Sequence, residues 1–317
     1  MLKYLIIPLA SDAVPFCHYP AFTSKPIDIS SNILCKAIFW AMKENLSVQF
    51  VYPSRPIAAE LQKIVDTTDH VDIIPEGIYT DDADRIVVIN DWQQWDTVDF
   101  RKETPYVIRT SFSELFANSD RIKSVLPQID RLNIVLTDVG ANTEDSLRQY
   151  KDFLESLIPS IAAEYKTGHT VQLNLLTDRM SLTGMNNCNA GDESITLAPD
   201  GNFYICPGFY NEGMAPVGNL ENGLDIKNPQ LYKLTHAPIC RECDAYQCKR
   251  CVWLNKHLTR EVNTPGREQC LIAHIERNAS KKLLEELRKL TPEYLPDTLF
   301  HEIDYLDPFD KILNKNN

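Results

Sequence analysis

Short apolar runs alternate with amphipathic segments along the first 180 residues of the chain. Apolar runs of this length are typical of buried strands, whereas segments 31–44 and 112–126 repeat their apolar residues at helical spacing. A third helix is expected to begin after Asn142 or Thr143, either of which can cap it. The expected strands are 5–9, 48–52, 71–74, 85–89, 106–109, 132–136 and 171–176. Strands that alternate with helices predict a mostly parallel sheet with crossover connections.

The pattern changes near residue 180, where cysteine, glycine, proline and asparagine become frequent and helical periodicity stops. Two short apolar runs, 194–198 and 202–205, flank Asp200 and Gly201, a pair that is typical of a hairpin turn. The expected hairpin places Cys206 at the end of its second strand.

A further amphipathic helix is expected beyond Cys270, and its apolar face carries Leu283, Leu284, Leu287 and Leu290. Pattern and composition together predict three parts. An α/β domain covers residues 1–180, a cysteine-rich domain covers 181–275, and a C-terminal helix and tail cover 276–317.

Charge and hydropathy exclude several classes of protein. The 317 residues carry a net charge of −12 and give a pI of about 5.1, which argues against general binding to nucleic acid. The sequence lacks an apolar stretch of the roughly 20 residues that span a bilayer, and Pro8 interrupts the apolar start, so no secretory signal is expected. We therefore expect a cytoplasmic protein that binds neither nucleic acid nor membrane, in a compartment where disulfides are rare.

Cysteine spacing is the strongest chemical signal in the chain. Seven of the nine cysteines are Cys188, Cys206, Cys240, Cys243, Cys248, Cys251 and Cys270. Thiolates this dense indicate metal binding, and soft sulfur ligands favour zinc or iron–sulfur clusters. Only four residues separate the two Cys-x2-Cys pairs, whereas zinc ribbons usually separate theirs by about 15 to 20. Two neighbouring metal centres are therefore easier to build than one, and a zinc site remains the alternative.

The order of these cysteines resembles the SPASM domain of radical SAM enzymes that modify peptides and proteins. The resemblance covers residues 181–275 and implies two [4Fe–4S] clusters. One would be held by Cys240, Cys243, Cys248 and Cys270, and the other by Cys188, Cys206 and Cys251. The last two gaps here contain four and two residues, where the family usually has five and three. A further family cysteine is missing from residues 182–187, which leaves the second cluster with an open iron or with a ligand from elsewhere.

The α/β half is similar to the partial (β/α) barrel of radical SAM enzymes, which hold their catalytic cluster with Cys-x3-Cys-x2-Cys just after the first strand. If Cys17 matches the third of these cysteines, Ala10 and Val14 occupy the first two positions. Neither side chain can bind iron. The Gly-Gly sequence that binds SAM in that family is also missing. The resemblance therefore implies a radical SAM-like domain that lacks the three-cysteine motif and does not cleave SAM.

A degenerate radical SAM-like half joined to a SPASM-like half resembles the CXXX-repeat peptide maturases, and so do the opening residues 2–7 and the stretch 16–19. This resemblance implies a maturation protein for a ribosomally synthesised, post-translationally modified peptide (RiPP). The implied partners are the precursor peptide and a radical SAM or other modifying enzyme. Two alternatives remain open: a zinc-stabilised interaction module, and an enzyme that uses an open iron at the Cys188 centre.

Other candidate residues carry weaker signals. Cys17 and His18 are either an ordinary loop pair or a retained functional pair, and Cys35 is expected in the core. His236 and His257 flank the clustered cysteines and are expected near the surface or behind the metal ligands. Core positions are favoured over a peptide groove for Trp92, Trp95 and Trp253. Asp138 ends a strand where such folds place site residues.

Overall fold

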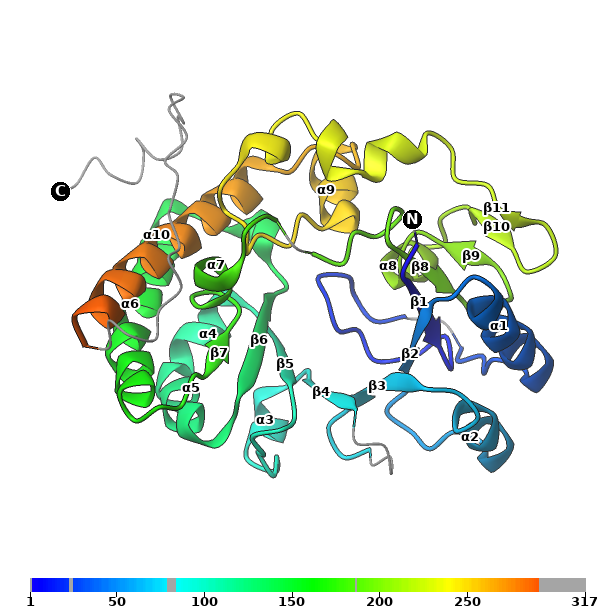
Figure 1. Ribbon diagram of the computed structural model, residues 1–317, viewed down its shortest axis with the longest axis horizontal. Helices are drawn as coiled ribbons and strands as arrows, with labels where there is room; N and C mark the ends of the chain where they lie inside the picture. Colours follow the sequence, from blue (N-terminus) through cyan, green and yellow to red (C-terminus); the bar gives the residue numbers. More distant parts are fainter. Residues whose placement is uncertain (1, 23–24, 79–83, 186, 291–317) are drawn as a thin grey trace.

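The structure is a computed structural model that describes residues 2–22, 25–78, 84–185 and 187–290 (Figure 1). The predicted tail, from residue 291 onward, lies outside the described residues. The three-part division of the chain stays a prediction. No helix within the described ranges combines the length and the apolar character needed to cross a membrane.

One large sheet organises the molecule and confirms the parallel α/β prediction. In the described part of the chain its nine strands follow the order β7-β6-β5-β4-β3-β2-β1-β8-β9. They are β1 Tyr4–Pro8, β2 Ser47–Val51, β3 His70–Pro75, β4 Arg85–Ile89, β5 Tyr106–Thr110, β6 Arg131–Leu136, β7 Gln172–Leu173, β8 Ser194–Leu197 and β9 Phe203–Tyr204. Neighbours from β7 to β8 run parallel, while β8 and β9 form the predicted antiparallel hairpin.

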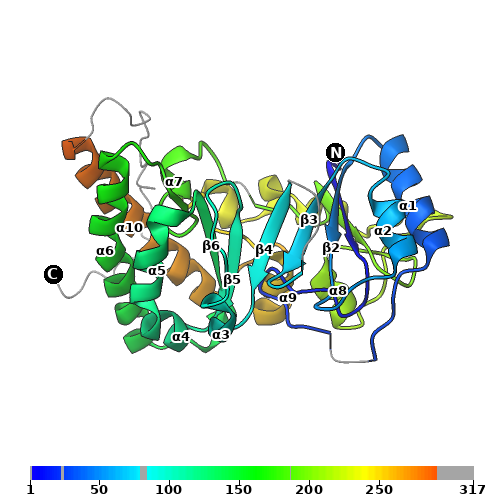
Figure 2. The same ribbon diagram turned by 90° about the horizontal axis from the view of Figure 1, so that it is seen from below.

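Helices cover this sheet, and Figure 2 shows α1 and α2 at one end of it with α4, α5 and α6 at the other. Their bounds are α1 Ser31–Lys43, α2 Ala59–Val65, α3 Trp92–Trp95, α4 Phe112–Ala117, α5 Ser119–Val125, α6 Glu144–Lys166, α7 Asp178–Ser181, α8 Pro207–Asn211, α9 Val252–Thr259 and α10 Arg267–Leu290. The side chain of Thr143 caps α6, as expected. The predicted helix 112–126 is instead divided at Asn118, whose side chain donates to the Glu114 carbonyl.

The predicted strand 171–176 is shorter than its apolar run suggests, because β7 covers only Gln172–Leu173. Beyond Leu173 the chain turns, and the Asn174 side chain takes the place of a strand backbone. Its Oδ1 accepts from the Ile134 N–H at 2.8 Å and its Nδ2 donates to the Ile134 carbonyl at 3.0 Å. The Asn174 amide therefore forms the hydrogen bonds that the N–H and carbonyl of Ile134 would otherwise form with a longer β7.

Strand residues alternate between two apolar layers. Leu5 and Ile7 of β1 belong to the layer shared with α1, whereas Ile6 points to the opposite face. That inner face carries Ile6, Val51, Ile73, Val88, Val107 and Val135. Ala13 and Val14, from the loop that follows β1, pack into the same layer. This loop therefore covers the inner face of the sheet, below the cysteine-rich segment (Figure 1).

The C-terminal helix begins earlier than predicted. Helix α10 starts at Arg267, so Cys270 lies on the helix and not before it. It packs along α6, where the Tyr150 hydroxyl donates to Glu276 Oε1 at 2.7 Å (Figure 1). Leu290, predicted on the apolar face, is 42% exposed and lines a surface groove between α10 and α6.

Two predictions about the core have opposite outcomes. Cys35 is exposed, so its core assignment was wrong: α1 buries Leu34, Ala37, Ile38 and Ala41, and Cys35 lies beside that stripe. The core positions of the tryptophans are confirmed, because Trp92, Trp95 and Trp253 are all buried.

Candidate metal centres

A first group of four thiols gathers between the cysteine-rich loop and α10. Its members are Cys240, Cys243, Cys248 and Cys270, and the other three lie close enough to Cys248 for their charges to raise its pKa further. Burial is the larger cause of that rise. Backbone N–H groups of Ala245 and Arg250 each donate to a sulfur, Cys243 Sγ and Cys248 Sγ, at 3.5 Å.

A second group contains Cys188, Cys206 and Cys251 together with a thiol from the other end of the chain. The Cys17 and Cys251 thiols are hydrogen-bonded to each other. That bond lowers the pKa of Cys17 and raises the pKa of Cys251. Burial raises the pKa of Cys206, and the charges of Cys188 and Cys17 raise it further. The structure thus brings Cys17 close to Cys188, Cys206 and Cys251, the three cysteines for which the sequence pattern offered no fourth cysteine.

Arg109 fixes the loop that carries Cys17. Its Nε donates to the Cys17 carbonyl at 2.8 Å and its Nη2 donates to the Tyr19 carbonyl at 2.7 Å. His18 Nδ1 donates to the Leu136 carbonyl at the end of β6, at 2.8 Å. Three hydrogen bonds therefore attach residues 17–19 to the carboxyl ends of β5 and β6.

Gly208 lets this loop approach the second thiol group closely. A Cβ on Gly208 would lie 2.7 Å from Tyr19 Cβ and 2.7 Å from Trp253 Cδ1. Gly208 is two residues beyond Cys206, and Trp253 is two residues beyond Cys251. Glycine is therefore needed for the contact among the three segments that carry Cys17, Cys206 and Cys251.

A buried charge cluster holds the loop between Cys243 and Cys248. Asp244 Oδ1 accepts from Arg277 Nη1 at 2.8 Å, and its Oδ2 lies 3.7 Å from Arg179 Nη2. The Arg179 guanidinium also lies 4.3 Å from the centre of the Tyr246 ring. Breaking such a pair leaves uncompensated buried charge and costs about 3–5 kcal/mol. The loop is therefore tied to both α7 and α10.

The donor chemistry around the thiols fits an anionic sulfur cluster. Within the described residues, Arg250 Nε and Nη1 and Trp253 Nε1 are buried without a hydrogen-bond partner. Arg250 is close enough to Cys240 and Cys188 for its charge to favour their thiolates. Cluster and cysteine sulfurs accept such hydrogen bonds. As the side chains stand, no set of three or more His, Cys, Asp or Glu side chains in the described ranges forms a metal-ion site.

Burial keeps most of these thiols protonated in the absence of metal. It raises the pKa of the buried Cys240 to about 11. A metal binds the thiolate, so binding at neutral pH must release protons.

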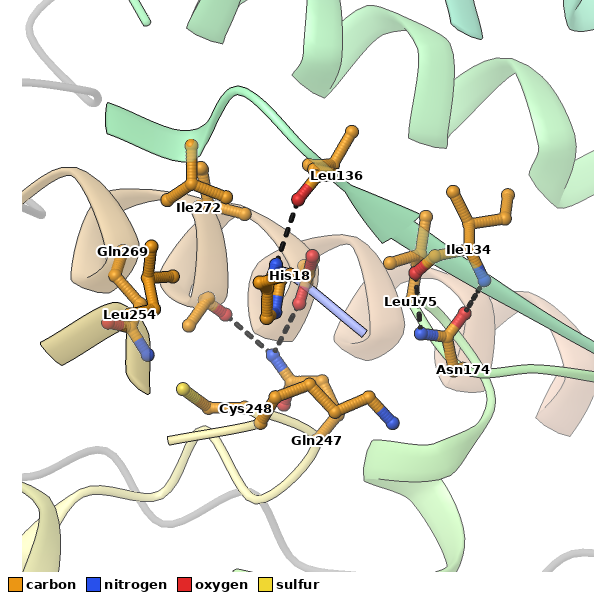
Figure 3. A pocket seen from close by; sticks show the side chains of 14 residues that line it. His18, Ile134, Leu136, Asn174, Leu175, Gln247, Cys248, Leu254, Gln269 and Ile272 are labelled. Carbon is orange, nitrogen blue, oxygen red and sulfur yellow. Dashed lines mark hydrogen bonds between the residues drawn. The ribbon is translucent and has the colours of Figure 1, made fainter. Parts of the chain in front are cut away.

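A small cavity lies at the carboxyl end of β6, beside Cys248 of the first thiol group (Figure 3). His18 and Leu136 line one part of it, and Gln247 and Cys248 line another. Glu276 also lines the cavity and accepts hydrogen bonds from Tyr150 and from Gln247 Nε2. Burial raises the pKa of Glu276 from its ordinary 4.5 to about 7.

His236, His257 and Asp138 were also candidates from the sequence. His236 and His257 are exposed, and His257 stacks on Trp253. Asp138 accepts from the N–H of Phe112 through both carboxylate oxygens and so anchors the start of α4.

His274 was missed by the sequence analysis. It is buried, and its Nε2 lies 3.6 Å from Cys243 Sγ. Cys270 and His274 are four residues apart on α10, so their side chains lie on the same face of that helix. An earlier predicted start for α10 would therefore have revealed this position.

Comparisons with known proteins define the class of fold. Neither a protein-family model nor a curated protein matches the sequence. Among solved structures, histidine-tagged anSMEcpe with bound AdoMet has a TM-score of 0.62 at 13% identity, covering 99% of this chain and 98% of that one. Native anSMEcpe with bound AdoMet and Cp18Cys peptide gives 0.58 at 13% identity, covering 91% and 100%. The predicted radical SAM-like α/β fold class is thereby confirmed.

We expect Gly208→Val to destabilise the protein by about 1–3 kcal/mol, because the new side chain would overpack the contact of Tyr19 with Trp253. Urea unfolding of the full chain measures this change. Gly184→Val is the matched control, because a Cβ at that position would meet nothing within 4 Å and its φ is not in the left-handed region. Equal unfolding midpoints for the two variants would contradict the packing described.

Glu276 should make stability depend on pH. Its pKa is higher in the folded state, so the folded state binds more protons and stability falls as pH rises from 4.5 through about 7. The loss is at most about 3 kcal/mol. Glu276→Gln should remove this decline, as measured by urea unfolding at pH 5 and pH 8. The exposed Glu285→Gln on the same helix should retain it, and identical pH profiles for all three proteins would refute the assignment.

Proposed function

We propose that this chain is a cytoplasmic maturation protein for a ribosomally synthesised peptide. In this proposal it binds the precursor peptide and carries two [4Fe–4S] clusters, but it does not cleave SAM. A radical SAM or other modifying enzyme would be its second partner. The observation that carries the proposal is the gathering of eight cysteine thiols into two groups of four at one end of a radical SAM-like fold.

The fold supports the assignment of a peptide as partner. The same fold is found in anSMEcpe, which binds AdoMet together with the Cp18Cys peptide in one crystal and the Kp18Cys peptide in another. A shared fold alone does not carry a substrate across. The proposal for this chain therefore rests on the fold together with its cysteine-rich region.

The loop after β1 supports the absence of SAM cleavage. Ala10 and Val14, at the positions that the first two cluster ligands would take, are buried apolar residues. Val14 packs into the inner apolar layer of the sheet. Cys17 is the only thiol in this loop, and it contacts Cys251.

When bound, the clusters would supply one-electron redox chemistry. Cys240, Cys243, Cys248 and Cys270 would hold one of them, while Cys188, Cys206 and Cys251 would hold the other. The chain's own residues would bury the clusters, donate backbone N–H groups to the sulfurs of Cys243 and Cys248, and compensate the negative charge with Arg250.

Metal analysis tests the cluster content. After strictly anaerobic purification we expect about eight irons and eight acid-labile sulfides per chain, the content of two [4Fe–4S] clusters. One or two zinc ions without sulfide would instead identify a zinc-stabilised interaction module and would contradict the proposal.

A second experiment tests the catalytic assignment. The reduced, cluster-loaded chain should produce no 5′-deoxyadenosine from SAM above the level of a no-protein control, because the loop after β1 lacks the three thiolates. Product should appear when a competent radical SAM enzyme is assayed in parallel. Sustained 5′-deoxyadenosine formation by the purified chain alone would sink the proposed absence of SAM cleavage.

A further inference from the structure

We propose that Cys17 is the fourth protein ligand of the centre formed by Cys188, Cys206 and Cys251. This inference rests on the proposed cluster-binding function and adds a ligand from the N-terminal half of the chain. The cysteine-rich segment lacks a further cysteine in residues 182–187, so a fourth thiolate has to come from another part of the fold.

Direct contacts place Cys17 in this centre. Its thiol is hydrogen-bonded with that of Cys251, and its charge acts on Cys188 and Cys206. Cys17 therefore lies within electrostatic reach of the other three thiols, and the contacts of Gly208 with Tyr19 and Trp253 bring its segment against those of Cys206 and Cys251. Trp253, two residues after Cys251, packs against Gly208, two residues after Cys206, and its buried Nε1–H has no hydrogen-bond partner.

The backbone around Cys17 is fixed independently of the thiol. Arg109 binds the carbonyls on either side of His18, and His18 itself binds the Leu136 carbonyl. Tyr19 packs against Gly208, just past Cys206. These contacts hold residues 17–19 against the cysteine-rich segment. Several contacts therefore set the backbone position of Cys17. A ligand held in this way loses little conformational freedom on binding metal.

The chemical step is a ligand exchange without oxidation. The proton that the Cys17 and Cys251 thiols share in their hydrogen bond goes to solvent, and the Cys17 thiolate forms an Fe–S bond in place of a solvent-derived ligand. Each iron of the cluster then has one cysteine ligand. The centre is closed, which removes the open iron that the alternative of an enzyme acting at the Cys188 centre requires.

The same assignment explains the loop after β1. One thiolate cannot belong to two clusters, and Cys17 is turned toward Cys251.

The two centres would also be close to each other, since Cys248 and Cys251 are three residues apart and their Cα atoms can be separated by at most about 11 Å. His18, next to Cys17, and Cys248 line the same cavity (Figure 3).

Cys17→Ala tests the assignment, and Cys35→Ala is the matched control because Cys35 is the remaining cysteine and is exposed on α1. The full chains are loaded with iron and sulfide anaerobically and treated with one equivalent of ferricyanide. An iron without a cysteine ligand is released by this oxidation and leaves a [3Fe–4S] cluster, which electron paramagnetic resonance detects.

We expect wild type and Cys35→Ala to keep about eight irons with no [3Fe–4S] signal, and Cys17→Ala to fall to about seven irons with up to one such signal per chain. Added 2-mercaptoethanol, a small thiol, should restore resistance to oxidation in Cys17→Ala. Full iron retention by Cys17→Ala, or a [3Fe–4S] signal from wild type, would overturn this inference alone. Zinc without sulfide in wild type would overturn the proposed function as well.

Differential alkylation of wild type keeps the test valid if Cys17→Ala does not fold. Iodoacetamide should label Cys35 in the loaded protein and leave Cys17 unlabelled. Removing the iron with a chelator, without denaturant, should make Cys17 reactive. Labelling of Cys17 at the same rate before and after iron removal would show that it is not a ligand.

Discussion

The fold of this protein depends on how the loop after β1 is held across the inner face of the sheet. The Arg109 guanidinium donates to two carbonyls of that loop, and hydrogen bonds from a charged donor contribute about 1.5–3 kcal/mol each. Ala13 and Val14 add apolar contacts to the same face. Because the loop is fixed at both points, it becomes part of the wall on which the cysteine-rich segment packs.

The cysteine-rich segment shares the main hydrophobic core, and buried polar groups fix its loops. Asp244 bridges toward Arg179 and Arg277, and Arg250 donates to the Tyr232 carbonyl at 2.6 Å. These contacts attach its loops to α7, to α10 and to one another. Buried charges of this kind stabilise little by themselves, but they fix one arrangement of the loop because every alternative leaves a charge unpaired. The positions of the cysteines in this loop are thus fixed by the surrounding protein.

Most elements followed from local pattern, and the failures have particular physical causes. The β-strands and α1 were predictable because period and burial agree. Strand β7 ends early because the Asn174 amide satisfies the β6 backbone, which an apolar run cannot reveal. Helix α10 begins before Cys270, so His274 near Cys243 was missed. Cys35 was assigned to the core although the buried stripe of α1 passes beside it.

The sequence by itself determined the α/β alternation, the hairpin before Cys206 and the seven-cysteine pattern, since each depends on residues that are close together in the chain. Only the tertiary structure decided where Cys17 belongs. It lies 171 residues from Cys188, and no local spacing connects the two. Their meeting depends on the parallel order of the strands and on the Arg109 contacts, which bring the first loop of the fold to its cysteine-rich end.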